Sequence, residues 1–185
     1  MIVTDRLTLA PATVELTRAA LDGPEALGAA LGAFVPPTWP PEYMDAPAFE
    51  FTLRRLVENP ANAGWWLYFV LLRGGSTPLL IGSSGYKGPP SEDGTVEIGY
   101  GIVSDQRRRG FASEAVQGLL AHAFALPALH RVIAETLPEL TPSIAVLRKS
   151  GFRPIGEGSE PGVIRFELLR AAWSPASHGS ASRSR

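Results

Sequence analysis

The stretch Arg107-Arg108-Arg109-Gly110-Phe111-Ala112 lies between two segments with clear periodicity. Residues 96–103 before it are mostly apolar and predict a strand. After it, apolar residues recur at helical spacing from Ala112 to Phe124 and predict an amphipathic helix. The first N–H groups of such a helix are unpaired, and its dipole adds about half a positive charge there. The stretch therefore predicts a turn that binds an anion, with three arginines as fixed cations; the alternative is a solvated basic helix cap.

The same residues carry a family resemblance. The order Arg107-x-x-Gly110-x-Ala112 after a strand resembles the acetyl-coenzyme A loop of the GNAT superfamily of N-acetyltransferases. Residues 96–102 are similar to that family's central strand, and Pro142–Phe152 to the helix and strand that close over the pantetheine arm. The opening Thr4–Pro11 is similar to the first strand of the subgroup that includes the ribosomal-protein alanine acetyltransferases.

The composition favours one ordinary globular domain. The chain has 185 residues, of which 45% are hydrophobic, and we expect a domain over residues 1–173. Residues 174–185 are rich in Ser, Ala, Arg and Gly and predict a disordered tail. The absence of cysteine excludes disulfides and a thiol nucleophile, and three dispersed histidines give no metal-ligand spacing.

Charge and hydropathy exclude two classes of partner. A net charge of −1 argues against general nucleic-acid binding, and no run approaches the roughly 18 apolar residues of a membrane span. The first residues lack a basic region followed by an apolar stretch, so we expect no signal peptide and a cytoplasmic location.

Periodicity and turn residues predict an α/β (α+β) domain with a mixed sheet. Asp45 is expected to cap one helix and Thr141 another. The predicted strands are 2–9, 65–73, 79–86, 96–103, 131–136, 152–156 and 163–169; the other helices are 12–21, 24–31 and 112–124. The succession of strand, helix and strand over residues 96–136 implies a right-handed crossover and parallel pairing.

The resemblance implies how acetyl-coenzyme A is bound. In the GNAT fold the two parallel central strands splay apart, and the amide arm of the cofactor inserts between them. The backbone of Ile102 and Val103 would bind the arm, while Gly99 and Gly101 leave room for the thioester. The pyrophosphate would bind to Arg107, Arg108, Arg109, Gly110, Phe111 and Ala112. No metal is expected.

Acetyl transfer to an amine requires a proton acceptor, because a free alkylamine has a pKa near 10. Glu97 is the candidate base, since alternation places it with Gly99 and Gly101 on the open face of the strand. The alternative is a solvent-facing glutamate, or one paired with an arginine of the sheet. The resemblance implies that Ser143, near the sulfur, assists departure of the thiolate; the alternative is a serine that caps its own helix. Tyr100 is a second candidate acid.

The acceptor amine would bind to the first helices and the loop that follows them, as in the family. Trp39 and Tyr43 could wall a pocket, and Glu42 or Asp45 could attract the amine; alternatively, Trp39 covers the core. Two positions depart from the family pattern. Leu140 stands where many members carry an asparagine that contacts the cofactor, and Ala10 where the subgroup often has arginine.

These observations predict an N-acetyltransferase that transfers acetyl from acetyl-coenzyme A to a primary amine by direct attack in a ternary complex. The expected partner is a peptide N-terminus or a small-molecule amine. We leave open whether the chain forms a homodimer. The alternative function is a non-catalytic acyl-coenzyme A-binding module that senses or regulates; Leu140 keeps this alternative open.

Overall fold

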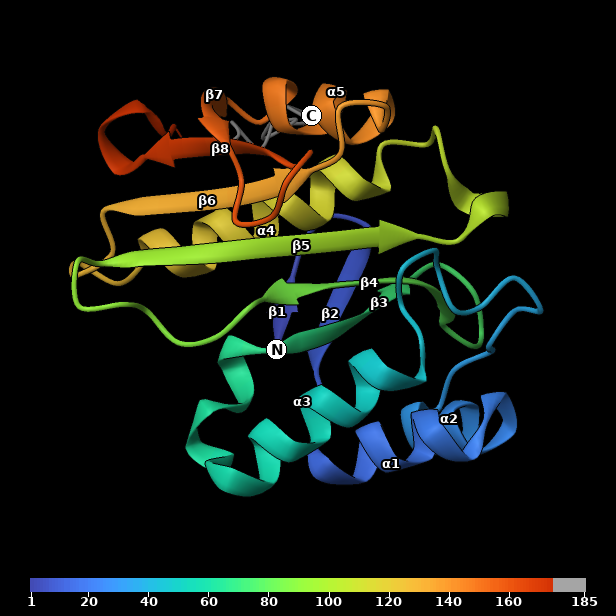
Figure 1. Cartoon of the computed structure of the whole chain (residues 1–185). Coiled ribbons are helices and arrows are strands. Elements are labelled where there is room, and N and C mark those ends of the chain that lie inside the picture. The colour runs from blue at the N-terminus through green and yellow to red at the C-terminus, as the bar shows by residue number, and fades with distance from the viewer. Residues whose placement is uncertain (175–185) are drawn as a thin grey trace, which may run out of the picture.

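The computed structural model of the chain describes residues 1–174, so the predicted disordered tail lies outside the described residues except for Ser174. One mixed sheet of eight strands runs through the molecule in the order β1-β2-β3-β4-β5-β6-β8-β7 (Figure 1). Its strands are β1 (Ile2–Val3), β2 (Leu7–Pro11), β3 (Leu67–Leu72), β4 (Leu79–Tyr86), β5 (Thr95–Ile102), β6 (Arg131–Thr136), β7 (Arg153–Glu157) and β8 (Ile164–Leu169). This architecture confirms the predicted α/β class.

Helices cover both faces of the sheet. The group α1 (Val14–Asp22), α2 (Pro24–Leu31) and α3 (Ala46–Glu58) lies on one side, and α4 (Phe111–Phe124) and α5 (Thr141–Lys149) on the other (Figure 1). Short 3₁₀ turns occur at Pro60–Trp65, Ser104–Gln106 and Arg170–Ala172. Within the described residues, no helix is both long and apolar enough to span a bilayer.

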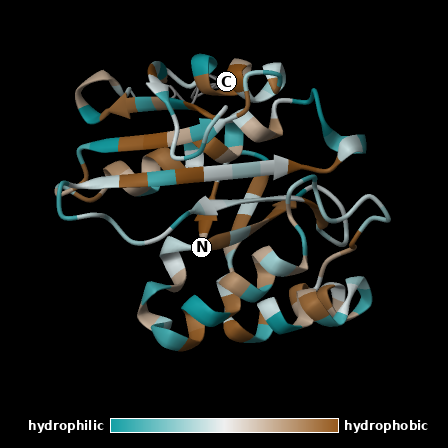
Figure 2. Ribbon diagram, viewed as in Figure 1, coloured by the Kyte–Doolittle hydropathy of each residue, from teal (hydrophilic) through white to brown (hydrophobic). Residues whose placement is uncertain are grey.

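Alternation along β3 shows why both faces are buried. Leu67 and Phe69 belong to the core cluster under α1–α3, while Tyr68 and Val70 belong to the cluster under α4. Hydrophobic residues accordingly follow the strands and the inward sides of the helices (Figure 2). A strand that is covered on both faces needs apolar residues at every position, which explains the continuous run Leu67–Leu72.

The central strands β5 and β6 are parallel, as the strand–helix–strand pattern predicted. Their pairing ends at Ile98 and Ala134, although β5 continues to Ile102 and β6 to Thr136. On its other edge β5 stays paired with β4 as far as Ile102. The two central strands therefore splay apart at their carboxyl ends, as the family resemblance implied.

The prediction of one strand over residues 2–9 is wrong. The segment forms two antiparallel strands, β1 and β2, joined by a turn. Within this turn the Thr4 N–H donates to the Leu7 carbonyl at 3.0 Å, and the Leu7 N–H donates to Thr4 Oγ1 at 3.1 Å. Side-chain hydrogen bonds of this kind compete with a continuous strand, and the alternation of apolar residues does not reveal them.

Two other boundaries differ from the prediction. Trp65 ends a 3₁₀ turn, and the strand begins at Leu67, because Pro60 starts a separate short turn after α3. Thr141 is the first residue of α5 rather than its cap; Leu140 holds the capping position, and no side chain caps this helix. The Asp45 cap of α3 is confirmed, since its carboxylate accepts from the Ala48 N–H at 3.1 Å.

Candidate cofactor and active site

The loop between β5 and α4 exposes a row of backbone donors. Within residues 1–174, the N–H groups of residues 108–113 have no hydrogen-bond acceptor. Gly110 occupies the capping position of α4 with φ 82°, and Arg108 has φ 61°, so two left-handed residues turn the loop toward the helix start. Successive free N–H groups of this kind, at the positive end of a helix, suit an anion.

The three arginines of the loop do different things. Arg107 is engaged within the protein: its Nε donates to the Ile102 carbonyl at 3.0 Å, and its Nη2 donates to Glu42 at 2.8 Å. Arg109 donates to the Gln106 side chain and lies 5.1 Å from the centre of the Phe111 ring. The Arg108 guanidinium makes no hydrogen bond or ion pair with any described residue. Of the three, Arg108 therefore remains freest for a ligand.

The edge of β5 beyond the splay offers unpaired backbone groups. In the β4–β5 ladder the Lys87 N–H donates to the Glu97 carbonyl, and the Val103 N–H donates to the Ile81 carbonyl. Strict alternation then turns the backbone groups of Tyr100 and Ile102 toward β6, where pairing has ended. These groups are the ones suited to the amides of a pantetheine arm.

This ladder bears on the predicted role of Val103. The Val103 N–H donates to the Ile81 carbonyl, and the Val103 carbonyl accepts from the Gln106 N–H at 3.0 Å. The carbonyl of Ile102 is also used, by Arg107. Of the backbone groups expected to bind the arm, the Ile102 N–H is still free to do so. The N–H and the carbonyl of Val103 are both already hydrogen-bonded within the protein.

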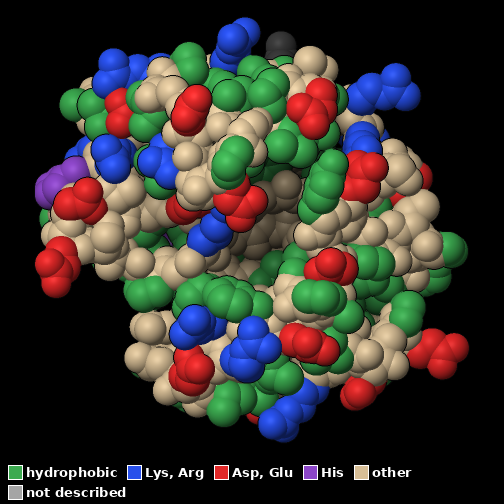
Figure 3. Space-filling model, viewed as in Figure 1, with side chains coloured by type: hydrophobic (Ala, Val, Ile, Leu, Met, Phe, Trp, Pro, Cys, Tyr) green, Lys and Arg blue, Asp and Glu red, His purple; other side chains and the backbone are tan. Residues whose placement is uncertain are grey.

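The space in front of β5 is open at one of the two glycines. A Cβ atom at Gly99 would meet no atom within 4 Å, whereas one at Gly101 would lie 3.2 Å from Pro41. Figure 3 shows that this face of the molecule is hollowed in front of β5, with acidic and basic side chains on the rim. The open face thus lies at Gly99, while residues 37–43, the loop predicted to bind the acceptor and called the acceptor loop below, pack against Gly101.

Glu97 lies on this open face, as alternation predicted, because its neighbours Val96 and Ile98 are buried on the other. Its side chain is 21% exposed and forms an ion pair with Lys87. A shallow cavity of about 220 Å³ adjoins it, lined among others by Lys87, Gly88, Pro89 and Ile133. The partner is thus a lysine from the end of β4 and not an arginine of the sheet.

Ser143 and Tyr100 lie together on the opposite face. The Tyr100 hydroxyl lies 3.1 Å from the Ser143 carbonyl oxygen and 3.2 Å from Ser143 Oγ. Ser143 makes no capping bond to its own helix. Burial raises the pKa of Tyr100 to about 12, against a smaller lowering by its hydrogen bond with Ser143. The two predicted acids therefore form one hydroxyl pair, and Glu97 is separated from them by the sheet.

The acceptor loop is hydrogen-bonded to residues 103–110, the loop between β5 and α4, which is called the phosphate loop below. Thr38 Oγ1 donates to Asp105 at 2.8 Å, and Glu42 accepts from Arg107. Glu42 and Asp45, the two carboxylates expected to attract the amine, are thus engaged with Arg107 and with the N-terminus of α3. Both remain exposed.

The two aromatic residues of this loop differ in burial. Trp39 is 9% exposed and packs against Phe49 and Phe69, with ring centres 6.3 and 6.0 Å apart. Of the two roles predicted for Trp39, its burial in the core under α1–α3 favours covering the core over walling a pocket. Tyr43 is 75% exposed and stays a candidate contact for the acceptor.

Sequence reasoning missed one cation beside the phosphate loop. Arg6, in the turn between β1 and β2, donates through Nε to Glu114 Oε2 at 2.7 Å and through Nη1 to the Arg109 carbonyl at 3.2 Å. Arg6 stands within the Thr4–Pro11 stretch that carries the subgroup resemblance, but nothing in its spacing connects it with a loop more than a hundred residues away.

Comparisons with known proteins agree with this geometry. Residues 6–153 match the family model described as "Acetyltransferase (GNAT) domain". A curated relative from Bacillus licheniformis, "Uncharacterized N-acetyltransferase p20", is 40% identical over 106 residues, which are 53% of this chain and 60% of that protein. The chain therefore matches less than two thirds of this relative's length.

Solved structures share the fold. The ribosomal-protein-S5-alanine acetyltransferase from Vibrio fischeri superposes with a TM-score of 0.63 at 20% identity, covering 94% of this chain and 98% of that one. RimJ from Mycobacterium smegmatis, in complex with CoA-disulfide, gives a TM-score of 0.61 at 22% identity, covering 89% and 82%. With the family match spanning most of its length, the chain belongs to the GNAT acetyltransferase family.

Proposed function

We propose that this protein is an acetyl-coenzyme A-dependent N-acetyltransferase that acts on a primary amine. The observation that carries the proposal is the row of N–H groups over residues 108–113 without an acceptor, directly beside the splay of β5 and β6 in a GNAT domain. The fit is supported by the open space at Gly99 and by the unpaired edge of β5. Acetyl-coenzyme A, when bound, supplies the acyl group as an activated thioester.

Different residues of the chain would bind the pyrophosphate and the arm of the cofactor. The N–H groups of residues 108–113, with Arg108 and Arg109, would hold the pyrophosphate by charge-assisted hydrogen bonds. The backbone of Tyr100 and the Ile102 N–H would pair with the amides of the arm. Both interactions would position the thioester at the splay. A bound amine beside it would react faster, because the two reactants are already held together.

Proton movement would run from one face of the sheet to the other. Glu97 would take the proton of the acceptor ammonium through Oε1 or Oε2, directly or by way of a water molecule. The Ser143 hydroxyl, supported by the Tyr100 hydroxyl, would donate a hydrogen bond to the departing sulfur. Because the two groups lie on opposite faces, an acceptor on the Glu97 side and a leaving group on the Ser143 side need not compete for space.

The acceptor amine would approach from the hollow in front of β5 (Figure 3), with Glu97 on the open face of that strand and the exposed Tyr43 as a candidate contact. The structural neighbour from Vibrio fischeri is named for a ribosomal-protein alanine, and by analogy we propose a peptide N-terminus as the acceptor. A small-molecule amine is the competing acceptor and becomes one arm of the test.

The first experiment is thermal unfolding with acetyl-coenzyme A, coenzyme A and ATP in parallel. At about 100 times its dissociation constant a ligand adds about 2.7 kcal/mol, or roughly 5–10 °C for a chain of this size. We expect a shift with both coenzyme A species and none with ATP. No shift at millimolar coenzyme A would refute the proposal.

The second experiment measures release of the thiol from acetyl-coenzyme A with peptides that begin with alanine or serine, with the same peptides blocked at the N-terminus, and with polyamines. Turnover of the free peptides alone supports the N-terminal acceptor. Turnover of polyamines instead would replace that acceptor with a small molecule. Binding without turnover of any amine would favour the non-catalytic acyl-coenzyme A-binding module.

A further inference from the structure

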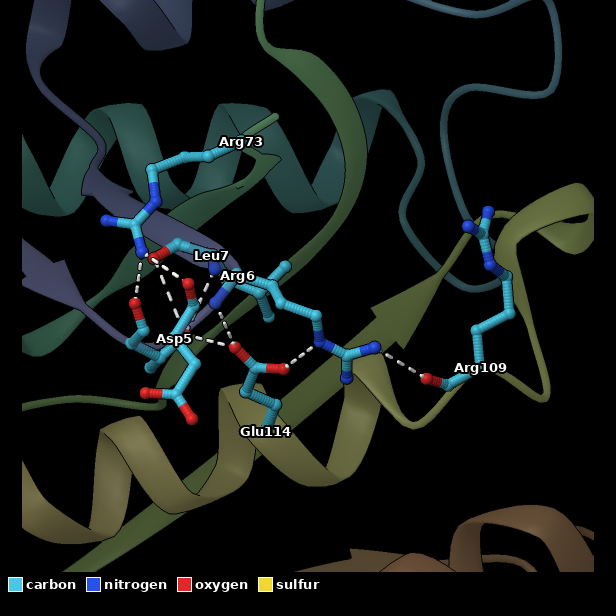
Figure 4. A network of polar contacts seen from close by, with 7 residues as sticks. Asp5, Arg6, Leu7, Arg73, Arg109 and Glu114 are labelled. Carbon is cyan, nitrogen blue, oxygen red and sulfur yellow. Dashed lines mark hydrogen bonds and ion pairs between the residues drawn. The ribbon is translucent and has the colours of Figure 1, made fainter. Parts of the chain in front are cut away.

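Arg6 reaches the start of α4 from a distant part of the sequence. It lies in the turn between β1 and β2, and its side chain crosses to the phosphate loop (Figure 4). Its guanidinium donates to Glu114 through Nε and to the Arg109 carbonyl through Nη1. Phe111 is the first residue of the helix, and the guanidinium carbon lies 4.5 Å from the centre of its ring. Three residues of the loop and helix thus surround one side chain.

Glu114 fixes the orientation of this guanidinium. One carboxylate oxygen accepts from Thr4 Oγ1 at 2.6 Å and from the Arg6 N–H at 2.7 Å, while the other accepts from Arg6 Nε. Both oxygens are therefore occupied, and the contacts of Arg6 at Nε and at Nη1 together fix the plane of its guanidinium. A planar guanidinium held at two nitrogens presents the third, Nη2, in a fixed direction.

The third nitrogen, Nη2, lies beside Gly110 in the phosphate loop. Nη2 of Arg6 makes no hydrogen bond or ion pair with any residue in the described part of the chain. It lies 3.5 Å from the point at which a side chain on Gly110 would begin. Gly110 is the capping residue of α4, within the row of N–H groups that lack an acceptor. Nη2 therefore lies beside this row of donors.

The contacts of the loop arginines leave a role for a cation from outside the loop. Arg107 is committed to Ile102 and Glu42, so the loop supplies fewer free cations than its sequence suggests. An arginine from the β1–β2 turn can supply the phosphate contact that Arg107 does not make, because the forked donors of a guanidinium match phosphate oxygens.

We infer that Arg6 binds the pyrophosphate of coenzyme A directly, as a cation supplied from outside the loop, with Glu114 as its positioning residue. The inference rests on the proposed function. It assigns the β1–β2 turn a role in cofactor binding, and it predicts that affinity for coenzyme A depends on a residue that precedes the acceptor site in the chain.

The test is calorimetric titration of the purified full chain with coenzyme A and with pantetheine, which carries the arm but no phosphate. We expect Arg6→Gln to raise the Kd of coenzyme A by about tenfold or more, the value of a charge-assisted hydrogen bond, and to leave the Kd of pantetheine unchanged. Arg6→Lys keeps the charge without the fork and should give a smaller loss. The salt dependence of coenzyme A binding should flatten in Arg6→Gln, because one screened ionic contact is gone.

Arg73→Gln is the matched control. Arg73 holds the same turn, donating through Nη2 to the Asp5 carbonyl at 2.8 Å and to the Thr4 carbonyl, but it makes no contact with the phosphate loop (Figure 4). If Arg6 acts only by holding the turn, Arg73→Gln will weaken coenzyme A binding as much as Arg6→Gln does. That result would overturn the inference.

The remaining outcomes separate this inference from the proposed function. If the wild-type chain binds no coenzyme A, the proposed function fails, and the inference with it. If the wild-type chain binds coenzyme A and Arg6→Gln binds it equally well, the inference alone fails. Should Arg6→Gln not fold, as judged by its thermal transition, Arg6→Lys decides: equal Kd values for Arg6→Lys and wild type would overturn the inference.

Discussion

The Tyr100 hydroxyl lies 3.2 Å from Ser143 Oγ and joins β5 to the first turn of α5 on the far side of the sheet from Glu97. The contact is local to the splay, because Tyr100 follows Ile98, the last residue of β5 that pairs with β6. Two hydroxyls that share one hydrogen bond can act as a single donor. The pairing joins Ser143, the acid that the family resemblance implied, with Tyr100, the second candidate acid.

We expect removal of either hydroxyl to slow acetyl transfer without loss of cofactor binding. Tyr100→Phe and Ser143→Ala should each lower kcat by about tenfold to a hundredfold, the range of one lost donor near the reacting atoms. The double variant should be little slower than the worse single variant, since the pair acts as a unit. Thiol-release kinetics and coenzyme A titration measure the two quantities. Additive losses in kcat would show that the hydroxyls act independently.

Two tyrosines, the buried Tyr68 and the partly buried Tyr100, should make the fold sensitive to alkali. Burial raises the pKa of Tyr68 and of Tyr100 to about 12, while an unfolded tyrosine titrates near 10. Above pH 10 the unfolded chain therefore releases these protons more readily than the folded chain, and the free energy of unfolding falls as pH rises toward 12. Each group contributes up to about 1.4 kcal/mol per pH unit in this window.

Urea unfolding between pH 8 and 11.5 checks this prediction. Tyr100→Phe should show a shallower loss of stability than wild type above pH 10, and the same slope below it. Equal slopes for the two proteins above pH 10 would mean that the Tyr100 phenol ionises as easily in the folded state as in the unfolded chain.

Strong local patterns made most of the fold predictable. The parallel pair β5 and β6 follows from a strand–helix–strand succession, and the bounds of β4 and β6 follow from apolar runs that end at turn residues. The turn at Thr4–Leu7 could not be read in this way, because its side-chain hydrogen bonds compete with a strand of the same composition.

The local geometry of the candidate site follows from the sequence where the residues are contiguous and not where the contacts are distant. Adjacent residues predict that residues 107–112 form a turn with free N–H groups before a helix, and alternation alone places Glu97 on the open face. The Arg107–Glu42 and Arg6–Glu114 pairs each join segments far apart in the chain, and no periodicity within either segment indicates them. The two predictions for Trp39, a pocket wall or a cover of the core, stayed open for the same reason, since its burial depends on the distant Phe49 and Phe69.

The ion pair between Lys87 and Glu97 predicts opposite effects for two neutral substitutions. Glu97→Gln should lower kcat at neutral pH by about a hundredfold, because the amine loses its proton acceptor, with unchanged affinity for coenzyme A. Lys87→Gln should lower the KM for the amine several-fold, because the carboxylate no longer has a competing cation within the protein.

Steady-state kinetics over pH 6–9 separate these effects, and Glu92→Gln, an exposed carboxylate in the loop between β4 and β5, is the matched control. Glu92→Gln should behave as wild type in both parameters. If the pH–rate profile of Glu97→Gln coincides with that of wild type, Glu97 is not the base. If Lys87→Gln raises the amine KM, the ion pair helps to shape the site rather than compete with the substrate.

The last prediction concerns two adjacent arginines that the sequence treats alike. Arg108 has no partner among residues 1–174, so Arg108→Gln should raise the Kd of coenzyme A by about tenfold and leave the amine KM unchanged. Arg107 instead ties the acceptor loop to the end of β5 through Glu42 and the Ile102 carbonyl. Arg107→Gln should therefore raise the amine KM while changing the Kd of coenzyme A less than threefold.

Glu42→Gln tests the same tie from its other end. It should raise the amine KM as Arg107→Gln does, and the double variant should add little, because both substitutions break one contact. Calorimetry gives the Kd, and initial rates at saturating acetyl-coenzyme A give the KM. If Arg107→Gln weakens coenzyme A as strongly as Arg108→Gln, Arg107 leaves Glu42 to bind the pyrophosphate, and the role that its place in the loop predicts is the correct one.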